Sequence, residues 1–336
     1  MSTPLTGPVP PDHPAHEPDP NVVTATVVAK GLADEPDLHP TLEADRAAHG
    51  SPVLEEPILT VRDLNIVYEV ENPVHAVKDA SFTLRRGEIL GLAGESGCGK
   101  TTLAYGLNQL HRPPARIVSG SVTFHDATSG DDVDVLALAG EQLRAFRWSQ
   151  VAMVFQGAMN SLNPVLSVAT QIGDVFTTHR PQMSATERRR RSEELLERVG
   201  VDPSRLAAYP HELSGGMRQR VMIAMALALD PQLMIMDEPT TALDVVVQRE
   251  ILQEILRLRQ ELGFAVVFIT HDLPMLLEIS DRIAVMKQGE IVELETAEDL
   301  YFTPQNPYTR RLLGSFPSLT GKTGDFVRAG FDQKEG

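Results

Sequence analysis

Short apolar runs alternate with amphipathic segments from Ile58 onward, and this pattern predicts a folded region. Alternating or continuous apolar runs predict strands at 59–61, 67–70, 81–84, 88–93, 121–124, 151–155, 233–236 and 264–270. Helical periodicity predicts helices at 165–178, 186–199 and 245–262, and the apolar run 221–229 predicts another. Buried strands that alternate with helices are typical of an α/β fold with a parallel sheet covered on both faces.

The first 57 residues have a different composition. They contain eleven prolines and ten acidic residues but only two basic ones, Lys30 and Arg46, and therefore hold half of the net charge. Such a segment buries too little apolar surface to offset its conformational entropy, so we expect a disordered, acidic, proline-rich tail. A docking arm for a partner is the alternative.

Composition narrows the class of protein. The 336 residues are 42% hydrophobic and 23% charged, as in an ordinary globular protein, and the net charge of −16 argues against a protein that coats nucleic acid or an anionic bilayer. The longest apolar run has nine residues, so no membrane span is expected, and no secretion signal is expected either. The single cysteine, Cys98, excludes an intramolecular disulfide and a cysteine-rich metal site, which makes the cytosol the default compartment.

A phosphate-binding loop follows the predicted strand 88–93. Residues 94–101 fit the pattern G-x-x-x-x-G-K-[ST] and lead into a predicted helix, the context that this motif requires. Its glycines let backbone N–H groups approach phosphate oxygens at a helix N-terminus. Lys100 supplies a positive charge for the β- and γ-phosphates, and the Thr101 hydroxyl is a ligand for Mg²⁺. We expect Cys98 to be a tolerated loop residue.

Two carboxylates end the apolar run 233–236. Ligands gather at this end of a parallel sheet. Asp237 suits Mg²⁺ coordination as a hard oxygen ligand, and Glu238 is placed to polarise an attacking water.

The segment 213–219, Leu-Ser-Gly-Gly-Met-Arg-Gln, lies between the two phosphate-site motifs. Along the chain, the phosphate loop is followed by a glutamine after a strand, then by Leu-Ser-Gly-Gly, Asp-Glu and a histidine. This order resembles the nucleotide-binding subunit of an ATP-binding-cassette (ABC) transporter. The resemblance covers about residues 58–315. It implies a P-loop NTPase cassette with a RecA-like mixed-sheet core, an antiparallel β subdomain and an α-helical subdomain. The implied domains are the tail at 1–57, the cassette at 58–298 with its helical subdomain at about 160–228, and a C-terminal extension at 299–336.

The resemblance implies roles for individual residues. Tyr68 matches the aromatic residue that stacks on adenine, with strand packing as the alternative. Gln156 matches the glutamine that senses Mg²⁺ and the γ-phosphate, and His271 matches the switch histidine. Glu238 matches the residue that activates water, and Asp244 matches the turn at the dimer interface. The implied ATP-binding residues are Tyr68, Gly94, Glu95, Ser96, Gly97, Cys98, Gly99, Lys100, Thr101 and Thr102. The implied Mg²⁺ residues are Thr101, Gln156 and Asp237, and the signature that acts on the opposite subunit comprises Leu213, Ser214, Gly215, Gly216 and Met217.

The implied mechanism needs two cassettes. Each chain holds ATP and Mg²⁺ but lacks the opposing signature, so two ATPase subunits close head-to-tail and complete each site. One cassette without a membrane span is typical of importers. The implied partners are a second ABC ATPase that is a paralogue of this chain, two transmembrane permease subunits and an extracytoplasmic solute-binding protein. No nucleic acid is implied. The implied location is the cytoplasmic face of the cell membrane.

Finer motifs resemble the oligopeptide, dipeptide and nickel permease ATPases. These motifs are at 160–164, 211–220 and 306–310, and Met217 with the run 221–229 resembles the first of the two paired ATPases. Two features depart from the family: Gly157 and Ala158 replace the usual Asp-Pro after the glutamine, and the C-terminal extension has no cysteines for an iron–sulfur site. The sequence leaves open whether the solute is a peptide, nickel or an oligosaccharide. A soluble ABC ATPase unconnected with transport, a small-molecule kinase and a non-hydrolysing ATP clamp are the alternative functions.

Overall fold

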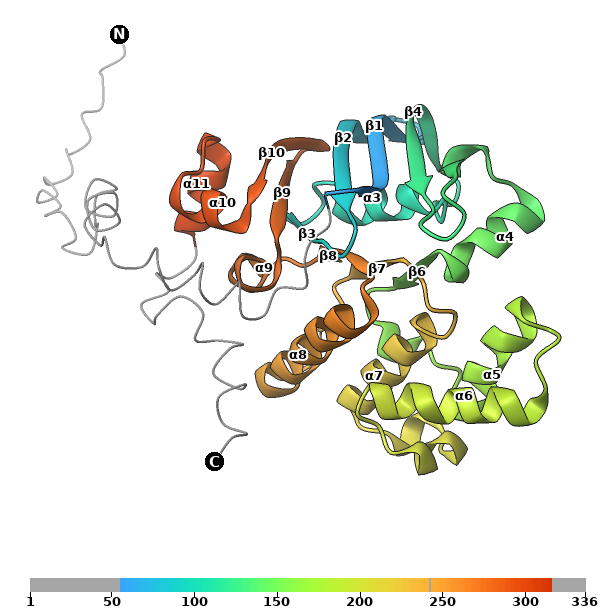
Figure 1. The fold of residues 1–336 in the computed structure, drawn as a ribbon. Coiled ribbons are helices and arrows are strands. Elements are labelled where there is room, and N and C mark those ends of the chain that lie inside the picture. Colours follow the sequence, from blue (N-terminus) through green and yellow to red (C-terminus); the bar gives the residue numbers. More distant parts are fainter. Residues whose placement is uncertain (1–54, 242, 316–336) are drawn as a thin grey trace, which may run out of the picture. The chain divides into compact units, whose positions relative to one another are not determined.

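The computed structural model describes residues 55–241 and 243–315 (Figure 1). The predicted tail therefore lies outside the described residues up to position 54, as do residues 316–336 of the predicted extension. The strands are β1 (Pro57–Tyr68), β2 (Val74–Arg85), β3 (Ile89–Ala93), β4 (Ala115–His125), β5 (Asp132–Asp134), β6 (Val151–Val154), β7 (Leu233–Asp237), β8 (Ala265–Ile269), β9 (Arg282–Lys287) and β10 (Glu290–Thr296). The α-helices are α3 (Lys100–Leu107), α4 (Gly140–Ser149), α5 (Val168–His179), α6 (Ala185–Arg198), α7 (Gly215–Ala226), α8 (Val245–Leu262), α9 (Leu273–Ile279), α10 (Ala297–Phe302) and α11 (Pro307–Gly314).

A six-stranded mixed sheet forms the centre of the described region. Its strand order is β10-β9-β3-β8-β7-β6. The five strands from β9 to β6 are parallel, and only the edge strand β10 is antiparallel to its neighbour. The predicted parallel sheet is therefore confirmed, with one antiparallel edge added.

Successive residues of β7 face opposite sides of this sheet, as the period of two in a strand requires. Met234 and Met236 pack into an apolar cluster with residues of α5 to α9, whereas Leu233 and Ile235 join a second cluster with α3 and residues of β1, β2 and β4. All five residues of β7 are buried. Both faces of the sheet are therefore covered, which explains why β7 is a continuous apolar run rather than an alternating one.

The N-terminal half of the described region contains a separate four-stranded antiparallel sheet. Its order is β2-β1-β4-β5. The predicted strands at 59–61 and 67–70 are parts of the single strand β1, which ends at Tyr68, and the strand at 81–84 is the end of β2. Irregular pairing near Asp63, which has a positive φ of 48°, breaks the alternation of β1 and hides its continuity.

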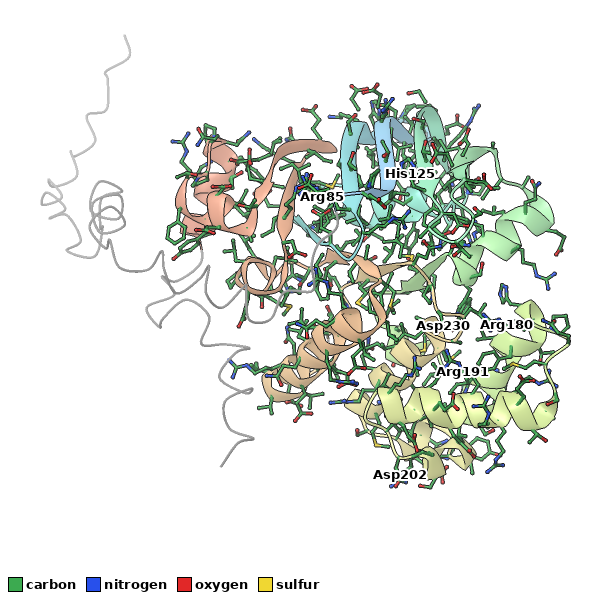
Figure 2. The ribbon with its side chains drawn as sticks, viewed as in Figure 1. Arg85, His125, Arg180, Arg191, Asp202 and Asp230 are labelled. Atoms are coloured by element: carbon green, nitrogen blue, oxygen red, sulfur yellow. The ribbon has the colours of Figure 1, made fainter. Side chains whose placement is uncertain are left out.

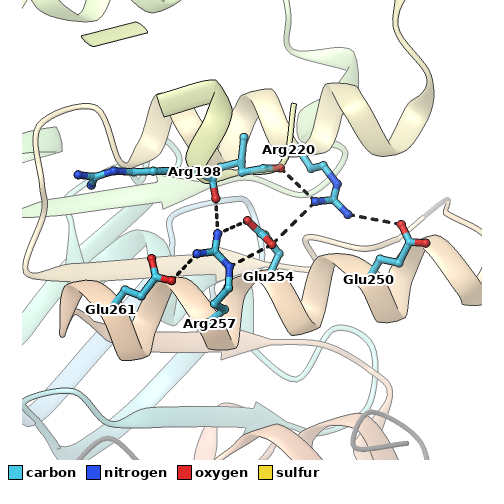
Figure 3. Close-up of polar contacts among 7 residues, drawn as sticks. Arg198, Arg220, Glu250, Glu254, Arg257 and Glu261 are labelled. Atoms are coloured by element: carbon cyan, nitrogen blue, oxygen red, sulfur yellow. Dashed lines mark hydrogen bonds and ion pairs between the residues drawn. The ribbon is translucent and has the colours of Figure 1, made fainter. Parts of the chain in front are cut away.

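The helical region of α5, α6 and α7 is joined to the sheet region through charged side chains. Arg191 of α6 lies beside Asp230, which precedes β7, and its Nη2 donates a hydrogen bond across 2.5 Å (Figure 2). Arg220 of α7 donates to the carbonyl of Val199 across 3.0 Å and to Glu250 of α8 across 3.4 Å (Figure 3). These contacts fix the middle of α7 relative to the end of α6 and to α8.

The C-terminal part of the described chain returns to the sheet. Helices α10 and α11 lie beside β9 and β10 (Figure 1). Helix α10 spans the predicted boundary between residues 298 and 299, so the fold is continuous at that point. Among the described helices, none has both the length and the apolar character needed to cross a lipid bilayer.

Candidate active site

The loop between β3 and α3 has a backbone that requires glycine at two positions. Gly94 has φ +144°, and a Cβ atom there would lie 2.3 Å from the carbonyl oxygen of Met286. Gly99 has φ +110°, and its Cβ would lie 2.3 Å from the carbonyl oxygen of Ala76. No side chain fits at either distance, so these glycines let the loop pass close to two neighbouring strands.

Lys100 is folded back over this loop. Its side chain is buried, and Nζ donates hydrogen bonds to the carbonyl oxygens of Gly94 at 2.8 Å and Glu95 at 3.0 Å. Cys98 Sγ lies 3.7 Å from the same amine. The thiol is buried rather than displayed on the loop surface, so Cys98 is a packed part of the loop.

Asp237 lies at the end of β7, beneath the start of α3. It is fully buried, and the hydroxyl of Thr101 donates a hydrogen bond to its Oδ1 across 3.2 Å. Its other oxygen, Oδ2, has no hydrogen-bond partner among the described residues. Burial raises the pKa of the Asp237 carboxyl, and the nearby charge of Glu238 raises it further, against the effects of Thr101 and Lys100. A hydroxyl beside a buried carboxylate with a free oxygen fits the oxygen ligands that Mg²⁺ prefers.

Three side chains converge on Glu238. Gln156 Nε2 donates to Oε2 across 2.8 Å, the Thr241 hydroxyl donates to the same oxygen across 3.0 Å, and His271 Nδ1 lies 3.3 Å from Oε1. The backbone of Glu238 has φ +47°, a left-handed conformation that is uncommon for a residue other than glycine. Its N–H is held by the carbonyl of Ile269 across 2.9 Å. The carboxylate is therefore fixed in direction by contacts from three separate segments.

A cavity of about 840 Å³ lies over the phosphate loop and Glu238. Ten of its lining residues are sequence-predicted: Tyr68, Ser96, Gly97, Gly99, Lys100, Thr101, Thr102, Gln156, Glu238 and His271. Five were missed: Val74, His75, Ala76, Gln288 and Gly289. Of the other predicted residues, Gly94, Glu95, Cys98 and Asp237 lie beneath or beside the cavity without lining it.

The missed residues carry no chemical motif. His75 and its neighbours begin β2, next to the mouth of the cavity, and His75 Nε2 is 2.8 Å from Asn65 Oδ1. Gly289 lies in the turn between β9 and β10, and its N–H donates to the carbonyl of Cys98 across 2.9 Å. The only sequence signal was the Gln-Gly turn, which indicates a hairpin but not its neighbour.

Tyr68 ends β1 at the edge of the cavity. Its hydroxyl lies 3.1 Å from the Thr102 hydroxyl. This contact turns the ring toward the start of α3, on the cavity side of the strand. Stacking of Tyr68 on a base stays a prediction.

The predicted signature lies outside the cavity of its own chain. Ser214 begins α7, where its hydroxyl accepts a hydrogen bond from the N–H of Met217 across 3.2 Å. A Cβ on Gly216 would lie 2.7 Å from Cγ1 of Val247, so the signature packs against the first turn of α8. Asp244 begins α8 and accepts the N–H of Val247 across 3.0 Å. Leu213 is buried, and Gly215 and Met217 are partly exposed. Within one chain, the signature and Asp244 thus share a surface distinct from the phosphate site.

The ABC transporter family model matches residues 77–241. This match includes the phosphate loop, Gln156, the signature and the Asp237–Glu238 pair, in one continuous segment. The chain belongs to the ABC transporter family. Tyr68, Asp244 and His271 lie outside the matched segment, and the roles expected for them stay predictions.

Two kinds of relatives support this membership. The chain is 42% identical over 275 residues to the glutathione import ATP-binding protein GsiA of Escherichia coli strain K12. The aligned region covers 81% of this chain and 44% of that protein. It is 46% identical over 266 residues to the peptidoglycan transport ATP-binding protein YejF of Agrobacterium fabrum. The aligned region covers 78% of this chain and 47% of that protein. The chain thus spans about half the length of the curated relatives that it matches.

Solved cassettes share the fold. The dimeric ATP-binding cassette MJ0796, in a post-hydrolysis state with ADP and Pi, has a TM-score of 0.62 at 29% identity and covers 71% of this chain and 98% of its own. The cbiO1 structure from Clostridium perfringens, part of the ABC transporter complex cbiONQ, has a TM-score of 0.63 at 28% identity and covers 74% and 92%. The predicted cassette fold is therefore confirmed.

Proposed function

We propose that this chain is the ATP-hydrolysing motor of an ABC importer. The observation that supports hydrolysis most directly is the convergence of Gln156, Thr241 and His271 on Glu238. A carboxylate held by three side chains at the edge of the cavity of about 840 Å³ is arranged to orient a water molecule.

The phosphate loop and α3 supply the positive end of the site. The triphosphate would lie along the N–H groups of the loop, at the N-terminus of α3, where the helix dipole favours an anion. Lys100, whose ammonium group donates to the carbonyls of Gly94 and Glu95, would turn that group to the β- and γ-phosphates. Tyr68 would pack against the base.

Thr101 and Asp237 would hold Mg²⁺, with Gln156 beside them. When bound, the ion neutralises charge on the β- and γ-phosphate oxygens. The free Oδ2 atom of Asp237 would accept a hydrogen bond from a water of the ion's hydration shell. The raised pKa of Asp237 in the chain alone would fall once a cation lies beside it.

Hydrolysis would follow from position and charge. The water oxygen bonds to the γ-phosphorus while the bond to the bridging oxygen of ADP breaks, and the proton of the water moves toward the Glu238 carboxylate. His271 and Gln156 keep that carboxylate aimed at the water. Placement contributes most of the rate in such a reaction because the protein forms no covalent bond to the phosphate.

A second cassette would complete the site. Ser214 and Gly216 lie outside the cavity of their own chain, at the N-terminus of α7, which suits the γ-phosphate of an opposed nucleotide. Val245 and Val246, next to Asp244, are 78% and 69% exposed. Exposed valines beside the signature suit a closing interface, and the partner is most simply a second ABC ATPase of the paired type.

Membrane subunits would dock near Gln156. Val165 and Leu166 follow this glutamine in the chain and are exposed apolar side chains. These features support docking of a permease subunit on this side, at the cytoplasmic face of the membrane, with an extracytoplasmic binding protein delivering the solute. The glutathione and peptidoglycan names of the relatives favour peptides or peptide-containing solutes over nickel and oligosaccharides.

The test uses the full chain, with and without its permease subunits. Fluorescent ATP binding and phosphate release are measured for the parental chain, for Lys100→Ala and for the control Lys78→Ala, whose amine pairs with Glu290 3.8 Å away. We expect Lys100→Ala alone to lose at least about tenfold in ATP affinity. Phosphate release by the reconstituted complex should rise with binding protein loaded with peptide. A parental chain that neither binds ATP nor releases phosphate would contradict the proposal.

A further inference from the structure

The last described helix, α11, contacts the phosphate loop directly. Tyr308 lies in its first turn and is 5% exposed. The backbone N–H of Glu95, the second residue of the loop, donates a hydrogen bond to the Tyr308 hydroxyl across 3.3 Å. The contact joins residues 213 positions apart. Tyr308 belongs to the Asn-Pro-Tyr-Thr motif, to which neither the family match nor the proposed mechanism assigns a role.

The start of α11 is firmly attached to β10. The Asn306 side chain accepts the N–H of Tyr308 across 2.8 Å and donates to the carbonyl of Val292 across 3.2 Å. The buried carboxylate of Glu293 accepts the N–H groups of Gln305 and Asn306, at 2.5 Å and 3.2 Å. Tyr308 is therefore held from the sheet side and is not a loose surface ring.

The Tyr308 ring also has a charged neighbour. Lys287, the last residue of β9, places Nζ 5.0 Å from the ring centroid, within the range of a cation–π contact. Strand β9 pairs directly with β3, which leads into the loop. Ring and hydroxyl are thus oriented by the same strands that carry the loop.

Glu95 is the link to the phosphate site. Its carbonyl oxygen accepts hydrogen bonds from Lys100 Nζ at 3.0 Å and from the N–H of Cys98 at 3.3 Å. The peptide unit on one side of Glu95 is held by Tyr308, and the one on the other side holds Lys100. We propose that Tyr308 is a positioning residue for the phosphate loop, which lets the C-terminal segment set how tightly the chain binds ATP.

The hydroxyl suits this task at neutral pH. A tyrosine phenol is neutral at pH 7 because its ordinary pKa is about 10, and burial raises the pKa of Tyr308 further. It therefore accepts the N–H without placing a negative charge in the loop. The inference rests on the proposed ATP-binding function, but the contact itself is testable without nucleotide, through the thiol of Cys98.

The experiment compares Tyr308→Phe with Tyr301→Phe in the full chain. Phenylalanine keeps the ring and removes only the hydroxyl, and Tyr301 is a matched tyrosine of the same segment whose ring contacts Phe302. Alkylation of Cys98, the single cysteine, by iodoacetamide is followed by mass spectrometry without nucleotide. Loss of one hydrogen bond should free the loop and speed alkylation about 3- to 10-fold in Tyr308→Phe. Tyr301→Phe should stay within about twofold of the parental rate.

The ATP arm separates this inference from the proposed function. Tyr308→Phe should raise KM for ATP about 3- to 10-fold with kcat within about twofold, because the groups around Glu238 are untouched. Asn306→Ala, which loosens the start of α11, should act in the same direction. Unchanged alkylation and unchanged KM in Tyr308→Phe overturn the inference even when the parental chain hydrolyses ATP. A parental chain without ATP binding overturns the proposed function, whereas faster alkylation of Tyr308→Phe still supports the contact.

Discussion

The side-chain amide of Gln156 donates a hydrogen bond to the carboxylate of Glu238 across 2.8 Å, which joins the loop after β6 to the end of β7. Adjacent strands of a parallel sheet bring these two segments together although they are 82 residues apart. Any movement of the loop that carries Gln156 therefore changes one of the contacts that aim Glu238.

Replacement of Gln156 should slow hydrolysis more than it weakens binding. In Gln156→Ala the carboxylate loses one of its three donors, so we expect kcat to fall about tenfold, with KM for ATP within a few-fold. Steady-state phosphate release measures both. The exposed Gln142 on α4 provides the control, Gln142→Ala, which should match the parental chain. An equal effect of the two variants on kcat would contradict this role of Gln156.

Glu238→Gln should separate binding from hydrolysis. The amide keeps the shape of the side chain but cannot take a proton, so we expect phosphate release to fall about 100-fold or more. ATP affinity should stay within about threefold, and size-exclusion chromatography with ATP should show more of the paired form. Glu295→Gln, on the exposed side of β10, is the control. Hydrolysis at the parental rate in Glu238→Gln would rule out the water-activating role.

Asp237 gives a prediction for pH. Because burial raises its pKa, the folded chain binds a proton that the unfolded chain releases, so its contribution to stability is greatest below the ordinary aspartate range and is lost as pH rises through the raised value. Asp237→Asn has no such loss. Without nucleotide and metal, the variant should become more stable relative to the parental chain as pH rises from 4 to 7, by about 2–4 °C in Tm.

Calorimetry at several pH values measures this difference. The same variant should lose Mg²⁺-dependent hydrolysis, since its side chain no longer offers a carboxylate. A constant difference in Tm across that pH range would show that the buried carboxyl does not titrate there.

The Arg220 contacts give a prediction for stability. Arg220 donates to the carbonyl of Val199 and to Glu250, and its side chain is 17% exposed, which means that its removal leaves a partly buried carbonyl without its donor (Figure 3). We expect Arg220→Ala to lower the free energy of unfolding by about 1–3 kcal/mol. Arg189→Ala removes an exposed ion pair with Glu193 and should cost about 0.5 kcal/mol or less. Urea unfolding compares the two, and equal losses would contradict the prediction.

The sequence predicted helix α8 to the residue because local signals mark both of its ends. Asp244 caps its first turn, and Gly263 ends it in a left-handed conformation with φ +74°. Helix α5 begins three residues later than its apolar pattern, since Ser167 rather than the apolar run determines the start. The helix expected at 221–229 is α7, which begins at the signature glycines and ends at Ala226.

Several strands were predicted incompletely or not at all. Irregular pairing divided β1 into two apparent strands. Strand β10 was missed because its apolar residues are interspersed with charged ones, and β9 was missed although its four central residues are a continuous apolar run. At the site, motifs predicted which side chains take part but not which atoms meet. The contacts of Gln156 with Glu238 and of Glu95 with Tyr308 depend on strand order, which no local pattern of the sequence contains.

Strand order also has a consequence for synthesis of the chain. The strand that leads into the phosphate loop, β3, lies between β8 and β9, and both of these neighbours are made more than 170 residues later. A ribosome-bound chain that has emerged only as far as α8 has the loop residues without the strands that flank them. Pairing at such long sequence separation is slow, so the ability to bind a nucleotide arrives only after β8 and β9 have been made, and not when the loop motif itself is made.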